Sequence, residues 1–432
     1  RGSRRHRARR RSMASMMQAQ NQIRRTNSQL GRQLGRDYAP VPGGSAYDGD
    51  GGHAVGPAND CEGCLSIVWG QPILTGMLVF VPIGFAAHIT DMAPPFVFGF
   101  NFLAIIPLAW LIGKSTEDVA ASLGQTFGGL LNATFGNVVE MLICIAGIRN
   151  NEIVVVQCTL LGSILSNLLL VLGTAFLVGG MFVPTQKYSQ QGAATQCSLM
   201  AMTVFAIGLP TLYANILSQD DEFQRMVEVS RWSSVFLLFT YCAYLYFQLG
   251  THRCLFEGED ADDEEEPPDL TPCTAAILLG IATVVTSFST DFLIHAIKGT
   301  VSSWDVSQEF IGIILLPIIG NAAEHYTAIT VAARDKMDLS LGVAAGSSCQ
   351  MGLLVTPFTV LVGWAYGTEM TLDFHSFQLA VLLLAVFLAT NILSNGESNW
   401  LEGLMLLVTY FILALIYFFE GSGEGSSLAT LA

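Results

Sequence analysis

Two short matching segments, GNVVE at residues 136–140 and GNAAEH at residues 320–325, place a carboxylate inside long apolar stretches. In each segment a glutamate, Glu140 or Glu324, follows an asparagine by three residues, so both side chains share one face of a helix. Ionisable residues inside membrane-spanning helices are costly and mark functional sites by default. The sequence therefore predicts a polar site assembled from two similar parts.

The composition predicts an all-α polytopic membrane protein. The chain has 432 residues, of which 51% are hydrophobic and only 13% are charged, whereas soluble proteins carry about 25% charged residues. The apolar residues form blocks of about 20 or more, long enough to cross a bilayer as helices. The eleven expected spans are residues 72–90, 96–113, 117–148, 152–181, 193–217, 230–250, 273–295, 307–334, 339–363, 376–395 and 399–420.

The second half of the sequence repeats the first at an offset of 184 residues. The pairs that coincide are Gly136 with Gly320, Asn137 with Asn321, Glu140 with Glu324, and Gly162-Ser163 with Gly346-Ser347. The repeated unit has five spans, and because five is odd, the second copy must enter the membrane from the opposite side. We expect one extra first helix followed by two inverted five-helix repeats, an arrangement found in many secondary transporters.

Two polar segments lie outside these repeats: one precedes them and the other joins them. Residues 1–36 hold eleven arginines and no acidic residue, whereas residues 257–269 hold nine acidic residues. The basic segment is either an organellar targeting peptide or a cytosolic tail, and the acidic run is typical of a solvated loop. The positive-inside rule places both on the cytosolic side. Nucleic-acid binding is not expected, because no folded module follows the basic segment.

These features predict six regions. They are a disordered basic tail and linker at 1–71, an extra transmembrane helix at 72–95, a first repeat at 96–250, an acidic cytosolic linker at 251–272, a second repeat at 273–420 and a C-terminal tail at 421–432.

The candidate ligands offer oxygen atoms. Besides the two glutamates, the set comprises Gly136, Asn137, Gln157, Ser163, Ser166, Asn167, Gly320, Asn321, Ser347, Ser348 and Gln350. Oxygen ligands in this number suit Ca2+, whose charge two carboxylates would match, and Mn2+ accepts the same ligands. A serine or asparagine alone could instead only form a hydrogen bond between neighbouring helices. His325 either tunes the carboxylate or relays a proton, or it is a satisfied packing residue.

No resident cofactor is expected. The CxxC at Cys61 and Cys64 has no second ligand pair nearby, although zinc sites need about four ligands. The remaining polar residues of the apolar segments contain no paired Cys or His.

Several longer stretches resemble the calcium/proton exchanger family of the Ca2+/cation antiporter superfamily, and most closely the vacuolar exchangers of fungi, plants and protists. These stretches are LLNATFGNVVE at 130–140, LLGSILSNLLLVLG at 160–173 and VAAGSSCQMGLLVTPF at 343–358. The resemblance implies that Glu140 and Glu324 bind the cation and exchange it for protons.

By the same resemblance, Asn137, Asn321 and Gln350 are supporting ligands. Met351 stands where the offset would place a copy of Asn167, which argues against a copied sodium site.

The expected function is therefore transport and not enzymatic catalysis. We expect Ca2+ from the cytosol to be exchanged for protons from an acidic compartment such as the vacuole, by alternating access. A Mn2+/H+ or a Na+-coupled exchanger is the alternative in the same class. A cation channel fits less well, because the two half-sites are unequal and not a ring of identical subunits. An intramembrane hydrolase also fits less well, because no HExxH motif is present.

Overall fold

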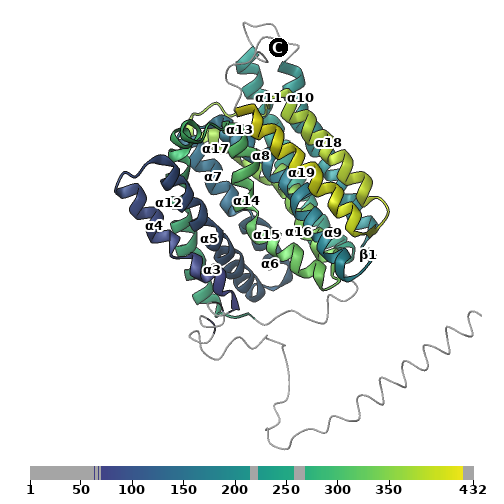
Figure 1. The fold of residues 1–432 in the computed structure, drawn as a ribbon. Helices are drawn as coiled ribbons and strands as arrows, with labels where there is room; N and C mark the ends of the chain where they lie inside the picture. Colours follow the sequence, from purple (N-terminus) through teal and green to yellow (C-terminus); the bar gives the residue numbers. More distant parts are fainter. Residues whose placement is uncertain (1–62, 64–66, 68–69, 215–221, 257–267, 422–432) are drawn as a thin grey trace, which may run out of the picture. The chain divides into compact units, whose positions relative to one another are not determined.

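The computed structural model describes residues 63, 67, 70–214, 222–256 and 268–421, which are almost entirely helical (Figure 1). The basic segment, the CxxC pair and most of the acidic run lie outside the described residues.

The first half comprises eleven helical elements and a short 3-10 turn. They are α3 (Pro72–Met77), α4 (Phe80–Ile89), α5 (Pro94–Ser122), α6 (Gly124–Phe135), α7 (Val138–Arg149), α8 (Ile153–Leu165), η1 (Ser166–Val171), α9 (Leu172–Phe182), α10 (Gln190–Ala214), α11 (Glu222–Tyr246), η2 (Phe247–Thr251) and η3 (Arg253–Leu255). The elements η1 and η2 are π-helical turns.

The second half follows the same plan. Its elements are α12 (Pro272–Trp304), α13 (Gln308–Phe310), η4 (Ile311–Leu315), α14 (Leu316–Gly320), α15 (Ala322–Ala333), α16 (Met337–Gln350), η5 (Met351–Val355), α17 (Thr356–Tyr366), α18 (Ser376–Leu393) and α19 (Trp400–Gly421). Two short strands, β1 (Gln186–Lys187) and β2 (Glu397–Ser398), pair antiparallel between the halves.

The helices match the predicted membrane architecture. Within residues 70–421, apart from the gaps at 215–221 and 257–267, nine helices are long and apolar enough to cross a membrane. Two bent helix pairs, α6 with α7 and α13–α14 with α15, raise the number to eleven. The prediction of an integral membrane protein with eleven spans is confirmed.

One predicted span boundary was wrong. Residues 117–122 belong to the end of α5 and not to the third span, which begins at Gly124. Gly124 has a φ of +74°, a left-handed conformation that glycine adopts readily and that separates the two helices. The polar residues before it gave no hydropathy signal for this break.

The 184-residue offset relates the two halves element by element. The π-helical turn η1 corresponds to η5, and both interrupt long helices at the same position. The bent pair α6–α7 turns by 43° and its counterpart, α14–α15, by 57°. Asn151 and Asp335, also 184 residues apart, both have a positive φ of about 60° in the loops that follow. The repeat seen in the sequence is therefore also a repeat of backbone conformation.

The helix ends lie on two faces. The first, the linker face, contains the turns at residues 183–189, 252–256, 268–271, 334–336 and 394–399. Gln186 bridges the halves here by donating to the backbone of Ala332 and to the Asp335 carboxylate, each at 2.9 Å. Asp269, at the end of the acidic run, is 2.7 Å from the Lys114 ammonium on α5.

The opposite face, the far face, contains the turns at residues 90–93, 150–152, 305–307 and 367–375. The Lys298 ammonium lies 2.7 Å from the Glu152 carboxylate there, which joins α12 to the α7–α8 turn.

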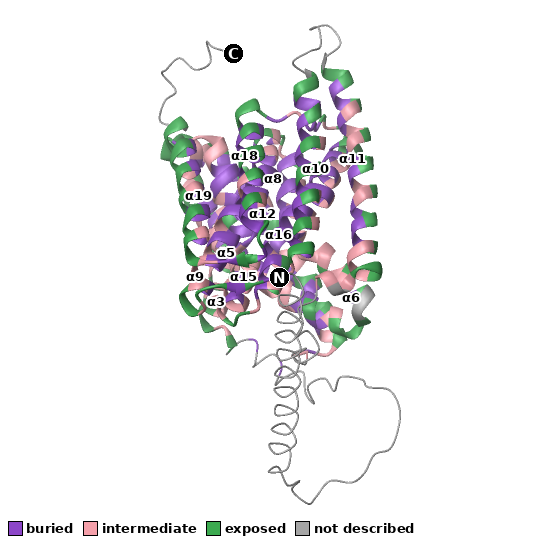
Figure 2. Cartoon of the chain, turned by 90° about the vertical axis from the view of Figure 1, so that its right-hand side faces the viewer, coloured by how far each residue is buried: buried purple, intermediate pink, exposed green. Residues whose placement is uncertain are grey.

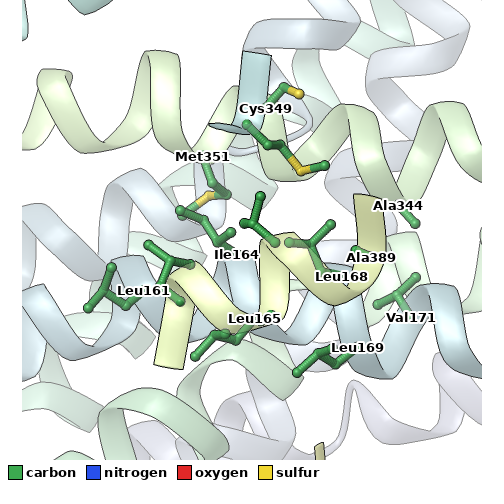
Figure 3. Close-up of a cluster of buried hydrophobic side chains, with 14 of the residues drawn as sticks. Leu161, Ile164, Leu165, Leu168, Leu169, Val171, Ala344, Cys349, Met351 and Ala389 are labelled. Carbon is green, nitrogen blue, oxygen red and sulfur yellow. The ribbon is translucent and has the colours of Figure 1, made fainter. Parts of the chain in front are cut away.

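The core surrounds the interrupted helices α8–η1 and α16–η5. These segments are the most buried of the spans, whereas the outward faces of α11 and α19 are exposed (Figure 2). Ile164 and Leu168 belong to one apolar cluster with Cys349 and Met351 from the second half (Figure 3). The first helices of the two halves, α5 and α12, pack along each other in a second cluster. This packing holds the two bent helix pairs at the centre of the protein.

Candidate cation-binding site

The two motifs form two helix breaks. Asn137 lies between α6 and α7, and Asn321 lies between α14 and α15, and neither has helical backbone angles. Pro317 precedes the second break and cannot donate a backbone hydrogen bond. Glu140 and Glu324 then fall in the first turn of the next helix, where the positive end of the helix dipole favours negative charge. Irregular backbone at this depth is typical of transporter substrate sites.

The glutamate of the first break packs against the backbone of the second. A Cβ atom added at Gly320 would lie 2.8 Å from Oε1 of Glu140, so any other residue here would displace this carboxylate. The carboxylates of Glu140 and Glu324 are close enough to interact electrostatically. The structure therefore brings together two charged groups that are 184 positions apart in the sequence.

Each break is held by a helix of the opposite half. Asn137 donates from its amide nitrogen to Oε1 of Gln350, at 2.5 Å. Asn321 donates to the backbone oxygen of Ser163 at 3.3 Å, and its own amide oxygen accepts from Asn167 at 3.5 Å. Gln350 ends α16, whereas Ser163 and Asn167 lie in α8 and η1. The asparagines thus orient the breaks and join the two repeats.

Several oxygen atoms at this place have no hydrogen-bond partner. They are both carboxylate oxygens of Glu140, Oε2 of Glu324, the hydroxyl of Ser163 and Oδ1 of Asn167. Leaving buried polar atoms unpaired costs free energy, and such exceptions call for an explanation such as a bound ion. Carboxylate, hydroxyl and amide oxygens are the ligands that Ca2+ prefers. The arrangement can therefore hold a hard cation or, on the carboxylates, protons.

A cavity of about 350 Å³ leads from this group to the linker face. Glu324, Ser347 and Gln350 line its inner part, and Glu117 and Phe256 line it near the linker-face ends of their helices. Glu140 does not line the cavity and is only 1% exposed. Of the two glutamates, Glu324 is thus the one that solvent reaches from the linker face.

The corresponding route to the far face is closed. A Cβ atom at Gly162 of α8 would lie 2.4 Å from the backbone oxygen of Ile313, and one at Gly312 would lie 2.5 Å from Cβ of Cys158. Helix α8 therefore touches the backbone of η4 directly. By the offset, the equivalent pair in the other half is α16 with α6, and that pair borders the open cavity instead. The structure is open to the linker face and closed to the far face.

Two of the predicted site residues lie apart from the central group. Gln157 donates its amide to the backbone oxygens of Thr371 and Asp373, at 3.1 and 3.0 Å, near the far face. The structure thus does not bring Gln157 to the central site, because the turn of α8 carries it away from the face that holds Ser163. Nε2 of His325 is 2.7 Å from the Thr174 hydroxyl on α9, so its ring packs on a neighbouring helix.

The remaining predicted residues lie at the site or beside it. Gly136 precedes the first break, Ser347 lines the cavity, and Ser348 bonds back to the backbone of Ala344. The sequence did not indicate Glu117 or Asn132, which also line the cavity. Asn132 lies one turn before Gly136, and this spacing is the signal that could have included it.

Comparison with known proteins agrees with this geometry. The pattern of the sodium/calcium exchanger protein family matches residues 94–250 and again residues 274–419. This chain belongs to the sodium/calcium exchanger family. The two matches fall on the two halves, as expected for a repeat in which each half carries one copy of the family's helices.

Several members of the family are similar over most of their length. Vacuolar cation/proton exchanger 2 of Oryza sativa subsp. japonica is 40% identical over 366 residues, which are 83% of this chain and 84% of the rice protein. The Ca(2+)/H(+) antiporter of Synechocystis is 41% identical over 361 residues, 80% of this chain and 96% of that protein. The vacuolar calcium ion transporter of Schizosaccharomyces pombe is 39% identical over 345 residues, 79% and 84% of the two chains.

Solved structures of the family have the same fold. The structure of native YfkE superposes with a TM-score of 0.69 at 30% identity, and covers 80% of this chain and 100% of YfkE. A crystal structure of an H+/Ca2+ exchanger CAX superposes with a TM-score of 0.58 at 12% identity, over 81% and 92% of the two chains. The second likeness concerns the fold alone.

Proposed function

We propose that this member of the sodium/calcium exchanger family is a secondary active antiporter that moves Ca2+ out of the cytosol in exchange for protons. The observation that carries the proposal is the group of unpaired buried oxygens around Glu140 and Glu324, each at the start of a half-helix. The names of the similar rice, Synechocystis and yeast proteins support the same activity.

Coupling follows from competition for the same atoms. When Glu140 and Glu324 are ionised, their two negative charges require compensation at this depth, since an unpaired buried charge is expensive. One Ca2+ supplies that compensation, and so do protons on the carboxylate oxygens. A transporter that changes conformation only when these two charges are compensated carries Ca2+ one way and protons the other. Mn2+ takes the same oxygen ligands and is a second proposed substrate.

Alternating access follows from the inverted repeat. In the described state α8 contacts η4, and α16 stands away from α6. In the alternative state, α6 would contact α16 and η4 would move away from α8. This change would open the same site to the far face. The site stays in place while the halves rock around it.

We place the linker face in the cytosol and the far face in the lumen of an acidic compartment, most specifically the vacuole. The arginine-rich segment and the positive-inside rule support this orientation, and the names of the plant and yeast relatives support the compartment. The substrates in this proposal are Ca2+ and H+, and no resident cofactor is needed. A copied sodium site is not supported, because the buried Met351 offers no oxygen ligand.

The test is Ca2+ uptake into proteoliposomes with an imposed pH gradient, with and without Na+. We expect uptake that follows the proton gradient and does not require Na+. Glu140→Gln and Glu324→Gln keep the shape of the side chain but remove its charge, and each should abolish uptake while the protein still inserts. Near-normal uptake in either variant would show that the carboxylate is not an essential ligand. A Na+ requirement, or channel-like conductance, would refute proton antiport.

A further inference from the structure

One ion pair ties the first helix of the second half to the far face. The Lys298 ammonium on α12 lies 2.7 Å from the carboxylate of Glu152, in the turn between α7 and α8. The Glu152 side chain is only 8% exposed, whereas that of Lys298 is 65% exposed. A carboxylate buried to this extent depends on its partner, because removing one member of a buried pair leaves an uncompensated charge. The pair therefore stabilises the contact between α12 and this turn.

The apolar residues next to this ion pair are buried together. Val155 on α8 and Ile297 on α12 are fully buried and belong to one apolar cluster. At the 184-residue offset they correspond to Leu339 on α16 and Gly113 on α5, which both line the cavity that opens to the linker face. Leu339 is 43% exposed. Equivalent helix faces are thus buried against each other at the far face and border an open cavity at the linker face.

The charges of the ion pair are not repeated in the other half. At the same offset Lys298 corresponds to Lys114, but Glu152 corresponds to Lys336. The turn before Lys336 has the same backbone form as the turn before Glu152, since the preceding residue has a positive φ in both. A state that mirrored the present one, closed at the linker face, would therefore bring Lys114 towards Lys336. Two like charges repel each other, so this closure gains no ion pair.

Lys114 instead pairs with acids beside the start of α12. Its ammonium lies 2.7 Å from the Asp269 carboxylate and 3.5 Å from that of Asp118. The Asp118 carboxylate also accepts the backbone N–H groups of Asp269 and Leu270, at 3.3 and 3.2 Å. The far face cannot copy this arrangement, because Ser302 is the offset counterpart of Asp118. The lysine of the linker face thus holds α5 to the segment before α12 and not to the turn between α15 and α16.

A second polar contact at the far face is also not repeated. Asn150 donates to the Asp291 carboxylate on α12 at 3.2 Å, and the Arg149 guanidinium lies 3.9 Å from the same carboxylate. At the offset, Asp291 corresponds to Pro107, which can form neither interaction. Because Arg149 and Asp291 are partly exposed, this contact contributes less than the buried carboxylate of Glu152 does. Both contacts favour the same closed arrangement of the far face.

We infer that Lys298 and Glu152 form a latch that holds the far face closed, and that the linker face lacks an equivalent latch, so that the state open to the linker face is favoured. The inference deepens the proposed function and rests on it for its purpose, which is to keep the central site accessible from the side where Ca2+ is taken up. The latch breaks whenever the site opens to the far face. It therefore sets the equilibrium between the two states and not the chemistry of ion binding.

The first test follows the opening of the far face through one introduced cysteine. Val155→Cys, in otherwise native full-length protein in proteoliposomes of known orientation, places a thiol where the closed state buries it. A membrane-impermeant maleimide is applied to the far face, and peptide mass spectrometry measures labelling at this position. Lys298→Met leaves the Glu152 carboxylate without its partner, so we expect labelling to become about fivefold faster or more, because its rate follows the population of the open state. An unchanged rate would overturn the inference.

A charge exchange separates the ion pair from general packing. Glu152→Lys combined with Lys298→Glu restores the attraction with the signs reversed, so labelling should be slower than with either substitution alone, because the two residues are in contact. A combined rate equal to or above those of the single variants would indicate loosened packing and would also overturn the inference. As a control, Lys187→Met breaks an exposed ion pair with Glu397, 3.9 Å apart, and should leave the rate unchanged.

The second test adds the missing latch at the linker face. Lys336→Glu copies Glu152 and offers Lys114 a partner when the linker face closes. Labelling of Leu339→Cys from the linker face should then fall, and labelling of Val155→Cys from the far face should rise, each by about threefold or more. Lys336→Gln removes the positive charge without adding an attraction, and its effect on both rates should be smaller. No change, or two rates that move in the same direction, would overturn the inferred difference between the faces.

These measurements do not require transport. If the native protein shows no pH-driven Ca2+ uptake, the proposed function fails, while the labelling rates still decide whether the latch holds the far face closed. If uptake is present and the labelling rates do not respond to the charges of the latch, the latch is refuted and the proposed function stands.

Discussion

Replacing Gly320 with alanine adds one methyl group at the point where the Glu140 carboxylate meets the second helix break. The new Cβ would lie 2.8 Å from Oε1, 3.3 Å from Cδ and 3.4 Å from Cγ of Glu140. Since carbon and oxygen resist approach closer than about 3.4 Å, the carboxylate must retreat by roughly 0.6 Å. The end of a glutamate side chain can make this movement, so we expect the protein to fold.

The displacement should weaken Ca2+ binding substantially. Ligand oxygens sit within about 2.3–2.6 Å of Ca2+, so a shift of roughly 0.6 Å exceeds the tolerance of the bond and removes one ligand. We expect a loss of about 1.4–3 kcal/mol of binding free energy, which is a rise of roughly 10- to 150-fold in the half-saturating Ca2+ concentration. The assay is pH-driven Ca2+ uptake into proteoliposomes over a range of Ca2+ concentrations.

A matched control lies in the same cavity. Gly342→Ala also adds a methyl group to a cavity-lining helix, but nothing lies within 4 Å of its Cβ, so the half-saturating concentration should stay within twofold of the native value. Adding Glu140→Asp to Gly320→Ala shortens the crowded side chain, and the two changes should be non-additive because the residues are in contact. Native-like Ca2+ dependence of Gly320→Ala would refute the assignment of Glu140 to this contact in the cation-bound state.

Three further predictions concern pH, gating and the acidic segment. Lowering the pH on the linker face at constant far-face pH should raise the half-saturating Ca2+ concentration on that face, because protons compete for Glu140 and Glu324. A half-saturating concentration that does not change with pH would contradict the proposal that Ca2+ and protons bind the same oxygens. Gly312→Ala should separate η4 from Cys158, so a thiol reagent applied to the far face should label that cysteine faster. An unchanged labelling rate in a variant with native expression would show that this contact does not close the route. Neutralising the acids of residues 257–269 should alter apparent affinity or regulation but leave exchange intact, since Phe256, just before this segment, lines the cavity, whereas Asp269 at its end pairs with Lys114 outside the cavity wall. Complete loss of transport in a well-inserted variant would place the segment in the transport path.

The sequence alone determined the number of spans, the repeat and the chemistry of the central site. Long apolar runs leave no other stable solution than helices in a bilayer, so the spans could be read directly. The matched Asn and Glu pairs are short-range patterns that keep their spacing in any helix, and the odd number of spans in each repeat fixes the inversion. The central pair, Glu140 and Glu324, followed from these local rules.

Other features depended on the rotation and packing of whole helices, which no local pattern encodes. Gln157 shares α8 with Ser163, yet the turn of the helix carries it to a separate cavity at the far face, where it donates to the backbone of Thr371. The break at Gly124 lies in a polar stretch without a hydropathy signal. Glu309, Asp373 and Glu420 are scattered in the sequence and line one cavity at the far face only because α13, α19 and the turn before α18 come together.

The tertiary structure also decided which of the two routes is open. The repeat makes the routes equivalent in sequence, so the motifs by themselves favour neither face. In the structure the close contact of α8 with η4, at Gly162 and Gly312, closes one route, while the gap between α16 and α6 leaves the other open. A duplicated sequence allows both the linker-face-open and the far-face-open arrangement. These differ little in free energy, and packing between the halves selects the one that is populated.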